Sequence, residues 1–152
     1  MIYKIKDIDN RCFHVKEGKT RAAARAIPIH PLIEPIIENL KDSSKDEYLI
    51  RGIKSGGYDN KRSWNFQKKL TRLRQKLGMP EGVNFHTLRK TFATRMENLG
   101  ILRNHISQLE DSNMALDEYS SGIVIEGLVE SINKLTYEEV DPFIKDTLKN
   151  SN

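Results

Sequence analysis

The sequence is organised around one stretch, Phe85-His86-Thr87-Leu88-Arg89-Lys90-Thr91-Phe92-Ala93-Thr94-Arg95. Its apolar residues and those just after it recur at helical spacing: Leu88, Phe92, Met96 and Leu99. This spacing is typical of an amphipathic helix with one buried face. We expect Thr87 to cap the helix and Gly100 to end it.

His86 and Arg89 lie three residues apart, so they share one edge of the first turn of this helix. The start of a helix with an arginine and a histidine beside it suits an anion, and a phosphate best. The alternative is a solvated basic face on an ordinary helix, and spacing alone does not decide between the two.

Charge is distributed unevenly along the chain, which carries +4 in total. Residues 51–95 hold 12 Lys and Arg against 2 acidic residues, a net +10, whereas residues 96–152 hold 4 against 11, a net −7. A basic middle of this size predicts a polyanionic partner such as DNA or RNA. The alternative is that the basic middle pairs with the acidic end of the same chain.

The flanking segments predict a β-hairpin followed by helices. Residues 11–16 alternate as a strand, and residues 25–29 read as the returning strand, with Pro28 placing it at an edge or at its end. Lys19 then lies near the hairpin tip, where an ordinary exposed lysine is the simplest interpretation. Residues 48–50 indicate a short strand.

Helices are predicted at 31–40, 63–77, 101–109 and 123–135, and a polar tail that frays at 136–152. The helix at 63–77 is the most clearly amphipathic, with an expected buried stripe of Phe66, Leu70, Leu73 and Leu77. Cations in and around it suit contacts to a phosphate backbone, and the alternative for each of them is an ordinary solvated side chain. The candidate DNA-binding residues are Lys61, Arg62, Lys68, Lys69, Arg72, Lys90 and Arg95.

Composition narrows the class of protein. A length of 152 residues predicts one domain, and no apolar run approaches the roughly 20 residues of a membrane span. Cys12 is the single cysteine, so neither an internal disulfide nor a cysteine metal cluster is expected, and a reducing cytoplasm is the expected location.

Three blocks of the sequence resemble the tyrosine recombinases, the phage integrase family. The first is Gly18-Lys19-Thr20 with Arg25-Ala26-Ile27-Pro28-Ile29, the second is the stretch that begins at His86, and the third is Met114 with Tyr119-Ser120-Ser121-Gly122. The resemblance implies an α+β fold, mostly α, in which a helical bundle carries a small antiparallel hairpin or sheet at its N-terminal edge. It covers most of the chain.

The same resemblance implies a chemistry that needs neither a metal nor a cofactor. Tyr119 would attack a phosphodiester of double-stranded DNA and form a 3′-phosphotyrosyl link. Arg89 and His86 would hold the phosphate, and Lys19 would protonate the leaving 5′ hydroxyl.

Two departures from the family's wording predict a truncated and impaired catalytic domain. The block that follows the family's first catalytic arginine begins at Met1, so that arginine and the N-terminal DNA-clamping domain are expected outside this chain. Three residues, including a helper histidine, are missing between Leu109 and Glu110. A prophage remnant and an incomplete reading frame both fit these departures. Two alternatives to catalysis stay open: a non-catalytic module that binds double-stranded DNA, and a homo-oligomer formed through residues 123–135.

Overall fold

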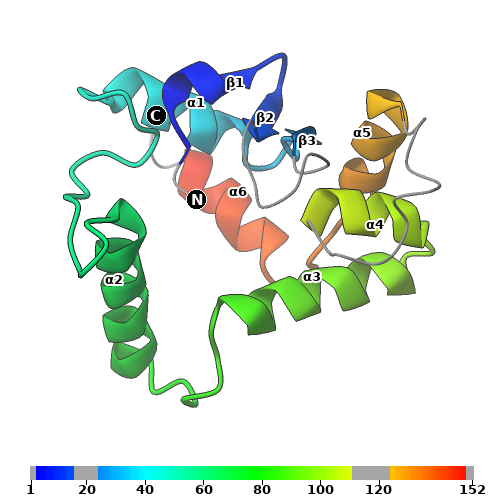
Figure 1. The fold of residues 1–152 in the computed structure, drawn as a ribbon. Coiled ribbons are helices and arrows are strands. Elements are labelled where there is room, and N and C mark those ends of the chain that lie inside the picture. Colours follow the sequence, from blue (N-terminus) through cyan, green and yellow to red (C-terminus); the bar gives the residue numbers. More distant parts are fainter. Residues whose placement is uncertain (1–2, 16–23, 111–123, 150–152) are drawn as a thin grey trace.

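The computed structural model describes residues 3–15, 24–110 and 124–149. Helices dominate this part of the chain, and a small antiparallel sheet lies near its N-terminus (Figure 1), so the α+β prediction is confirmed. The helices are α1 (Glu34–Ser43), α2 (Arg62–Lys76), α3 (Phe85–Asn98), α4 (Arg103–Glu110), α5 (Ile125–Asn133) and α6 (Asp141–Lys149). Among the described residues, no helix has the length and apolarity needed to cross a membrane.

The sheet has the order β1-β2-β3, with β1 at Ile8–Asp9, β2 at Cys12–Val15 and β3 at Arg25–Pro28. Neighbouring strands are antiparallel, as the hairpin prediction required. Pro28 ends the edge strand β3, where its missing N–H breaks no ladder. A short 3-10 helix, Ile5–Asp7, leads into β1. The strand expected at 48–50 is wrong, since that segment forms only an isolated bridge between Tyr48 and Lys4.

Buried apolar side chains form two clusters. The helical cluster joins α3, α4 and α5 through Met96, Ile101, Ile106, Leu109, Leu128 and Ile132. The sheet cluster joins β1, α1 and the segments beside them through Ile8, Ile29, Ile37 and Leu49. Strand β3 links the two, because Ile27 packs on the helical cluster while Ile29, just after the strand, belongs to the sheet cluster.

Helix α2 stands apart from both clusters (Figure 1). It forms close to where the sequence predicted, but the predicted burial of its apolar stripe is wrong. Leu73 and Leu77 are 51% and 58% exposed, and α2 buries no residue. A hydrophobic period indicates a helix, whereas burial also needs a neighbouring element to pack against. The aromatic contact of α2 with another helix is the stacking of Phe66 on Phe85, whose ring centroids lie 5.8 Å apart.

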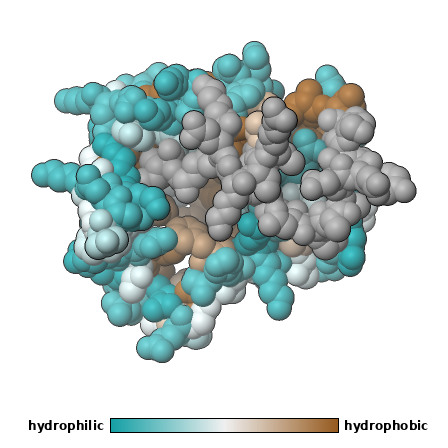
Figure 2. Space-filling view, viewed as in Figure 1, coloured by the Kyte–Doolittle hydropathy of each residue, from teal (hydrophilic) through white to brown (hydrophobic). Residues whose placement is uncertain are grey.

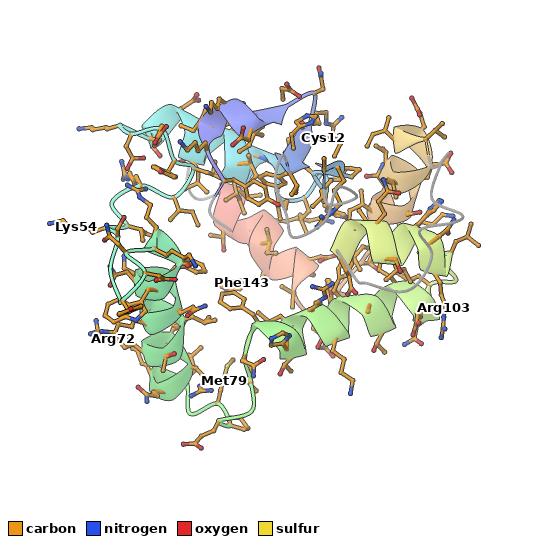
Figure 3. The ribbon with its side chains drawn as sticks, viewed as in Figure 1. Cys12, Lys54, Arg72, Met79, Arg103 and Phe143 are labelled. Carbon is orange, nitrogen blue, oxygen red and sulfur yellow. The ribbon has the colours of Figure 1, made fainter. Side chains whose placement is uncertain are left out.

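The C-terminal part of the chain differs from the fraying tail that we expected. After α5, which lies inside the predicted 123–135 helix, the backbone forms α6. Helix α6 directs Phe143, 72% exposed, toward the space between α2 and α3 (Figure 3). Figure 2 shows apolar side chains in this central region, with hydrophilic side chains around them.

Candidate phosphate-binding site

Helix α3 begins with a capping box rather than with the predicted Thr87 cap. Asn84 is the N-cap, and its side-chain oxygen accepts hydrogen bonds from the backbone N–H groups of His86 and Thr87, at 2.8 and 3.2 Å. Thr87 is the third helical residue, and its hydroxyl accepts a bond from the Asn84 N–H at 3.4 Å. The sequence contained both capping residues, and the structure uses them as a reciprocal pair.

This cap changes how an anion can bind. The amides of His86 and Thr87, which would otherwise be open to an anion at the helix start, already donate to Asn84. The dipole of the helix still favours negative charge at this end. An anion here must therefore be held mainly by side chains.

Arg89 is the best placed of these side chains. It lies one turn into α3, and 41% of its side chain is exposed. Its Nε atom lies 3.6 Å from Oε2 of Glu110, the last residue of α4. The helical cluster fixes both ends of this ion pair, since Phe92 packs on it one turn after Arg89, and Leu109 beside Glu110 is buried in it.

Glu110 is the functional candidate that sequence reasoning missed. Only 10% of its side chain is exposed, and its Oε1 atom has no hydrogen-bond partner among the described residues. Burial raises the pKa of the Glu110 carboxyl, and the nearby positive charge of Arg89 opposes that shift. In the sequence, Glu110 stood out only as the residue that follows the three positions missing relative to the family's motif.

His86 lies on the exposed surface of α3, one turn before Arg89. No hydrogen bond or ion pair engages its imidazole within the described part of the chain. The expected sharing of one helix edge follows from the helix itself, and the imidazole is available to a ligand.

The two further candidates on α3 have different surroundings. Lys90 is exposed beside a groove between α3 and residues 137–140. Arg95 is tied to the protein, because its Nε donates a 2.8 Å hydrogen bond to the carbonyl of Thr136. Arg95 therefore holds the segment before α6 against α3.

The candidates around α2 also divide into free and engaged cations. Lys69 and Arg72 are exposed, and Figure 3 shows Arg72 on the side of α2 that faces away from α6. Lys68 lies 3.4 Å from the ring centroid of Trp64, and Lys61 pairs with Asp59 at 2.7 Å. Arg62 has a largely structural setting: it stacks on Tyr48 and pairs with Asp46 at 3.4 Å.

Two predicted catalytic residues, Lys19 and Tyr119, lie outside the described residues. The structure therefore brings together His86 and Arg89, and adds Glu110. The cations of α2 are on a separate helix that stands away from this pair (Figure 1).

Comparison with known families identifies what this arrangement belongs to. The model of the phage integrase family matches residues 3–111, which include the sheet and α1 to α4. The chain belongs to the phage integrase family. No protein of curated function and no solved structure matches the chain.

Membership in the phage integrase family assigns the chain to DNA integration and recombination in general, and implies DNA as a partner. The match confirms the resemblance stated from the sequence. It also ends at residue 111, so it includes His86, Arg89 and Glu110 but not Tyr119.

Proposed function

We propose that this phage integrase domain binds a phosphodiester of double-stranded DNA at Arg89 and His86 and retains a weak strand-transfer activity through Tyr119. The observation that carries the proposal is the exposed edge of α3, where an arginine and an unengaged histidine lie one turn apart. Arg offers planar, paired N–H donors that match phosphate oxygens, and an imidazole N–H adds a further donor.

The proposed reaction follows from the residue types. The Tyr119 oxygen attacks phosphorus, the bond from phosphorus to the 5′ oxygen breaks, and a 3′-phosphotyrosyl link forms. Lys19 gives a proton to the departing 5′ hydroxyl, and Arg89 with His86 stabilises the charge that builds on the phosphate oxygens. Because one phosphoester bond replaces another, the covalent link conserves the bond energy, and rejoining needs no nucleotide cofactor.

Impairment is part of the proposal, and Glu110 supports it. The Glu110 carboxylate beside Arg89 opposes the binding of an anion there, and it competes for the guanidinium that should donate to the phosphate. The loss of one hydrogen-bond donor to a developing oxyanion commonly costs about 3–4 kcal/mol in transition-state stabilisation. We therefore expect slow strand transfer.

A second function is favoured by α2. Helix α2 contains no acidic and no fully buried residue, and four of its cations are exposed: Lys68, Lys69, Arg72 and Lys76. A solvated basic helix of this kind can bind the DNA backbone without any catalysis. In this alternative the domain is a non-catalytic duplex-binding module.

One experiment separates the two functions. The protein is incubated with a pool of nicked duplexes of randomised sequence. Cleavage beside the nick releases a short fragment that diffuses away, so rejoining is prevented and the covalent intermediate accumulates. We expect a denaturant-resistant adduct that Tyr119→Phe abolishes and Arg89→Ala reduces at least 100-fold. Tyr58→Phe, which changes an exposed tyrosine, is the matched control and should leave the adduct unchanged.

The outcomes divide cleanly. Duplex binding without an adduct removes the strand-transfer proposal and leaves the binding module. An adduct that persists in Tyr119→Phe shows that another nucleophile acts. Absence of both binding and adduct removes both functions.

A further inference from the structure

The backbones that carry Arg89 and Glu110 are held next to one another by packing. Arg89 extends from α3 and Glu110 ends α4, and these helices pack together through Met96, Ile106 and Leu109. Because the two backbones are held by a buried cluster, the carboxylate cannot withdraw from the guanidinium without a change in side-chain rotamer. An anion that approaches Arg89 therefore meets Glu110 already in place.

The surroundings of Glu110 increase its influence. Arg89 and Glu110 both line a cavity of about 580 Å³, whose other walls are mostly apolar and come from β3, α5 and α6. Water reaches the 41% exposed side chain of Arg89 but largely not the Glu110 carboxylate, so this pair is screened less than a pair with both partners exposed. The charged or titratable groups that line the same cavity are His30, Tyr137 and Asp141.

Glu110 also lacks full compensation for its burial. Its Oε2 atom faces Arg89, but its Oε1 atom is buried with no hydrogen-bond partner among the described residues. A buried carboxylate oxygen without a donor is costly, so Glu110 favours keeping Arg89 close. A phosphate at Arg89 would weaken that attraction and add a negative charge near the carboxylate.

We propose that Glu110 competes with the DNA phosphate for Arg89 and thereby sets the phosphate affinity of the site. This inference rests on the proposed role of Arg89 as a phosphate ligand. In the free chain the carboxylate neutralises the guanidinium. Phosphate binds when the Glu110 side chain is displaced or loses its charge.

The test is Glu110→Gln, which removes the charge and keeps the shape. Binding of inorganic phosphate to the full chain is followed by NMR titration, and binding of a short duplex is followed by fluorescence anisotropy. We expect the variant to bind phosphate roughly tenfold more tightly, since removing a like charge a few ångströms away at intermediate dielectric is worth at least this factor. In an Arg89→Gln background, the same change should have no effect, which a purely structural role of Glu110 would not predict.

The matched control is Glu34→Gln. Glu34 pairs with Arg11 at 2.6 Å, and neither residue lines the cavity of Arg89 and Glu110, so this change breaks an Arg–Glu pair and removes the same charge. It should leave phosphate affinity within twofold of the original. If Glu110→Gln does not fold, Glu110→Met tests the same loss of charge with a side chain suited to the apolar cavity.

The inference is overturned if Glu110→Gln, or Glu110→Met in its place, binds phosphate no more tightly than the original chain. Weaker binding would also overturn it, because Glu110 would then be orienting Arg89 for the phosphate. Tighter phosphate binding through Arg89 without any duplex binding supports this inference and counts against the proposed function. The two ideas can therefore fail separately.

Discussion

A single side chain, Asn84, sets where α3 begins and so sets the position of His86 and Arg89. Its oxygen satisfies two of the N–H groups that a helix start leaves open. The Thr87 hydroxyl, in turn, donates a 2.9 Å hydrogen bond to the carbonyl of Gly82, which ties the preceding turn to the helix. The register of the candidate phosphate ligands therefore depends on residues that do not contact a phosphate.

Asn84→Ala should lower the free energy of unfolding by about 1 kcal/mol, within the usual range of roughly 0.5–2 kcal/mol for a lost N-cap. Chemical denaturation followed by circular dichroism measures the change. Asn39→Ala is the control, because Asn39 is exposed inside α1, where alanine is the better helix former. A destabilisation of similar size in both variants would contradict the capping role of Asn84.

At this scale the sequence predicted residue types better than residue partners. The motif around His86 and Arg89 was recognisable because local spacing carries it. The pairing of Arg89 with Glu110 was not predictable, because it depends on how α3 packs against α4. Asn84 and Thr87 are both good cap formers, and propensity alone did not show that they act as a pair.

At the scale of elements, α2 is the clearest case in which periodicity and packing separate. Its apolar positions recur as in a buried helix, yet Leu73 and Leu77 are exposed. The cations Lys69 and Arg72 are likewise exposed. Helix α2 thus exposes these two cations to solvent, and it contributes no residue to either buried cluster.

Replacing Lys68, Lys69 and Arg72 together by Gln should weaken duplex binding and flatten its salt dependence. Each lost phosphate contact should lower the slope of log K against log salt by about 0.9. Anisotropy titrations at several salt concentrations measure that slope. The control replaces three other exposed lysines, Lys45, Lys134 and Lys145, and so makes an equal change in net charge.

An equal loss of affinity in both triple variants would show that net charge, rather than α2, governs binding. Unchanged binding in the α2 variant would exclude this helix as the DNA contact.

The other elements were largely predictable, with the exceptions of the strand at 48–50 and of α6. Helix α6 escaped prediction because its residues combine acidic, basic and apolar types in a segment that composition alone describes as a tail.

At the scale of the whole molecule, the helical cluster contains the two largest fully buried side chains of the described residues. Met96 and Leu128 are almost fully buried, and they lie on different helices, α3 and α5. His105 adds a polar tie between α4 and α5, since its Nδ1 lies 2.7 Å from the Ser131 hydroxyl. Long-range contacts of this kind are not visible in a sequence, which explains why fold class was predictable while burial was only partly so.

Leu128→Ala should lower the free energy of unfolding by about 2–5 kcal/mol, because it leaves a cavity in this cluster. Leu73→Ala makes the same change on exposed α2 and should stay within about 0.5 kcal/mol of the original. Urea denaturation of both variants provides the comparison. Similar losses in the two would mean that α2 packs against the protein in solution.

Strand β3 has a consequence for how the proposed chemistry is aligned. Lys19 precedes this strand in the sequence, and Ile27 within the strand packs on the same cluster as Phe92 of α3. Strand β3 and the helix that carries Arg89 thus pack on one buried cluster. A substitution at Ile27 should therefore change how β3 sits against α3, the helix that carries Arg89, although Ile27 lies far from Arg89 in the sequence.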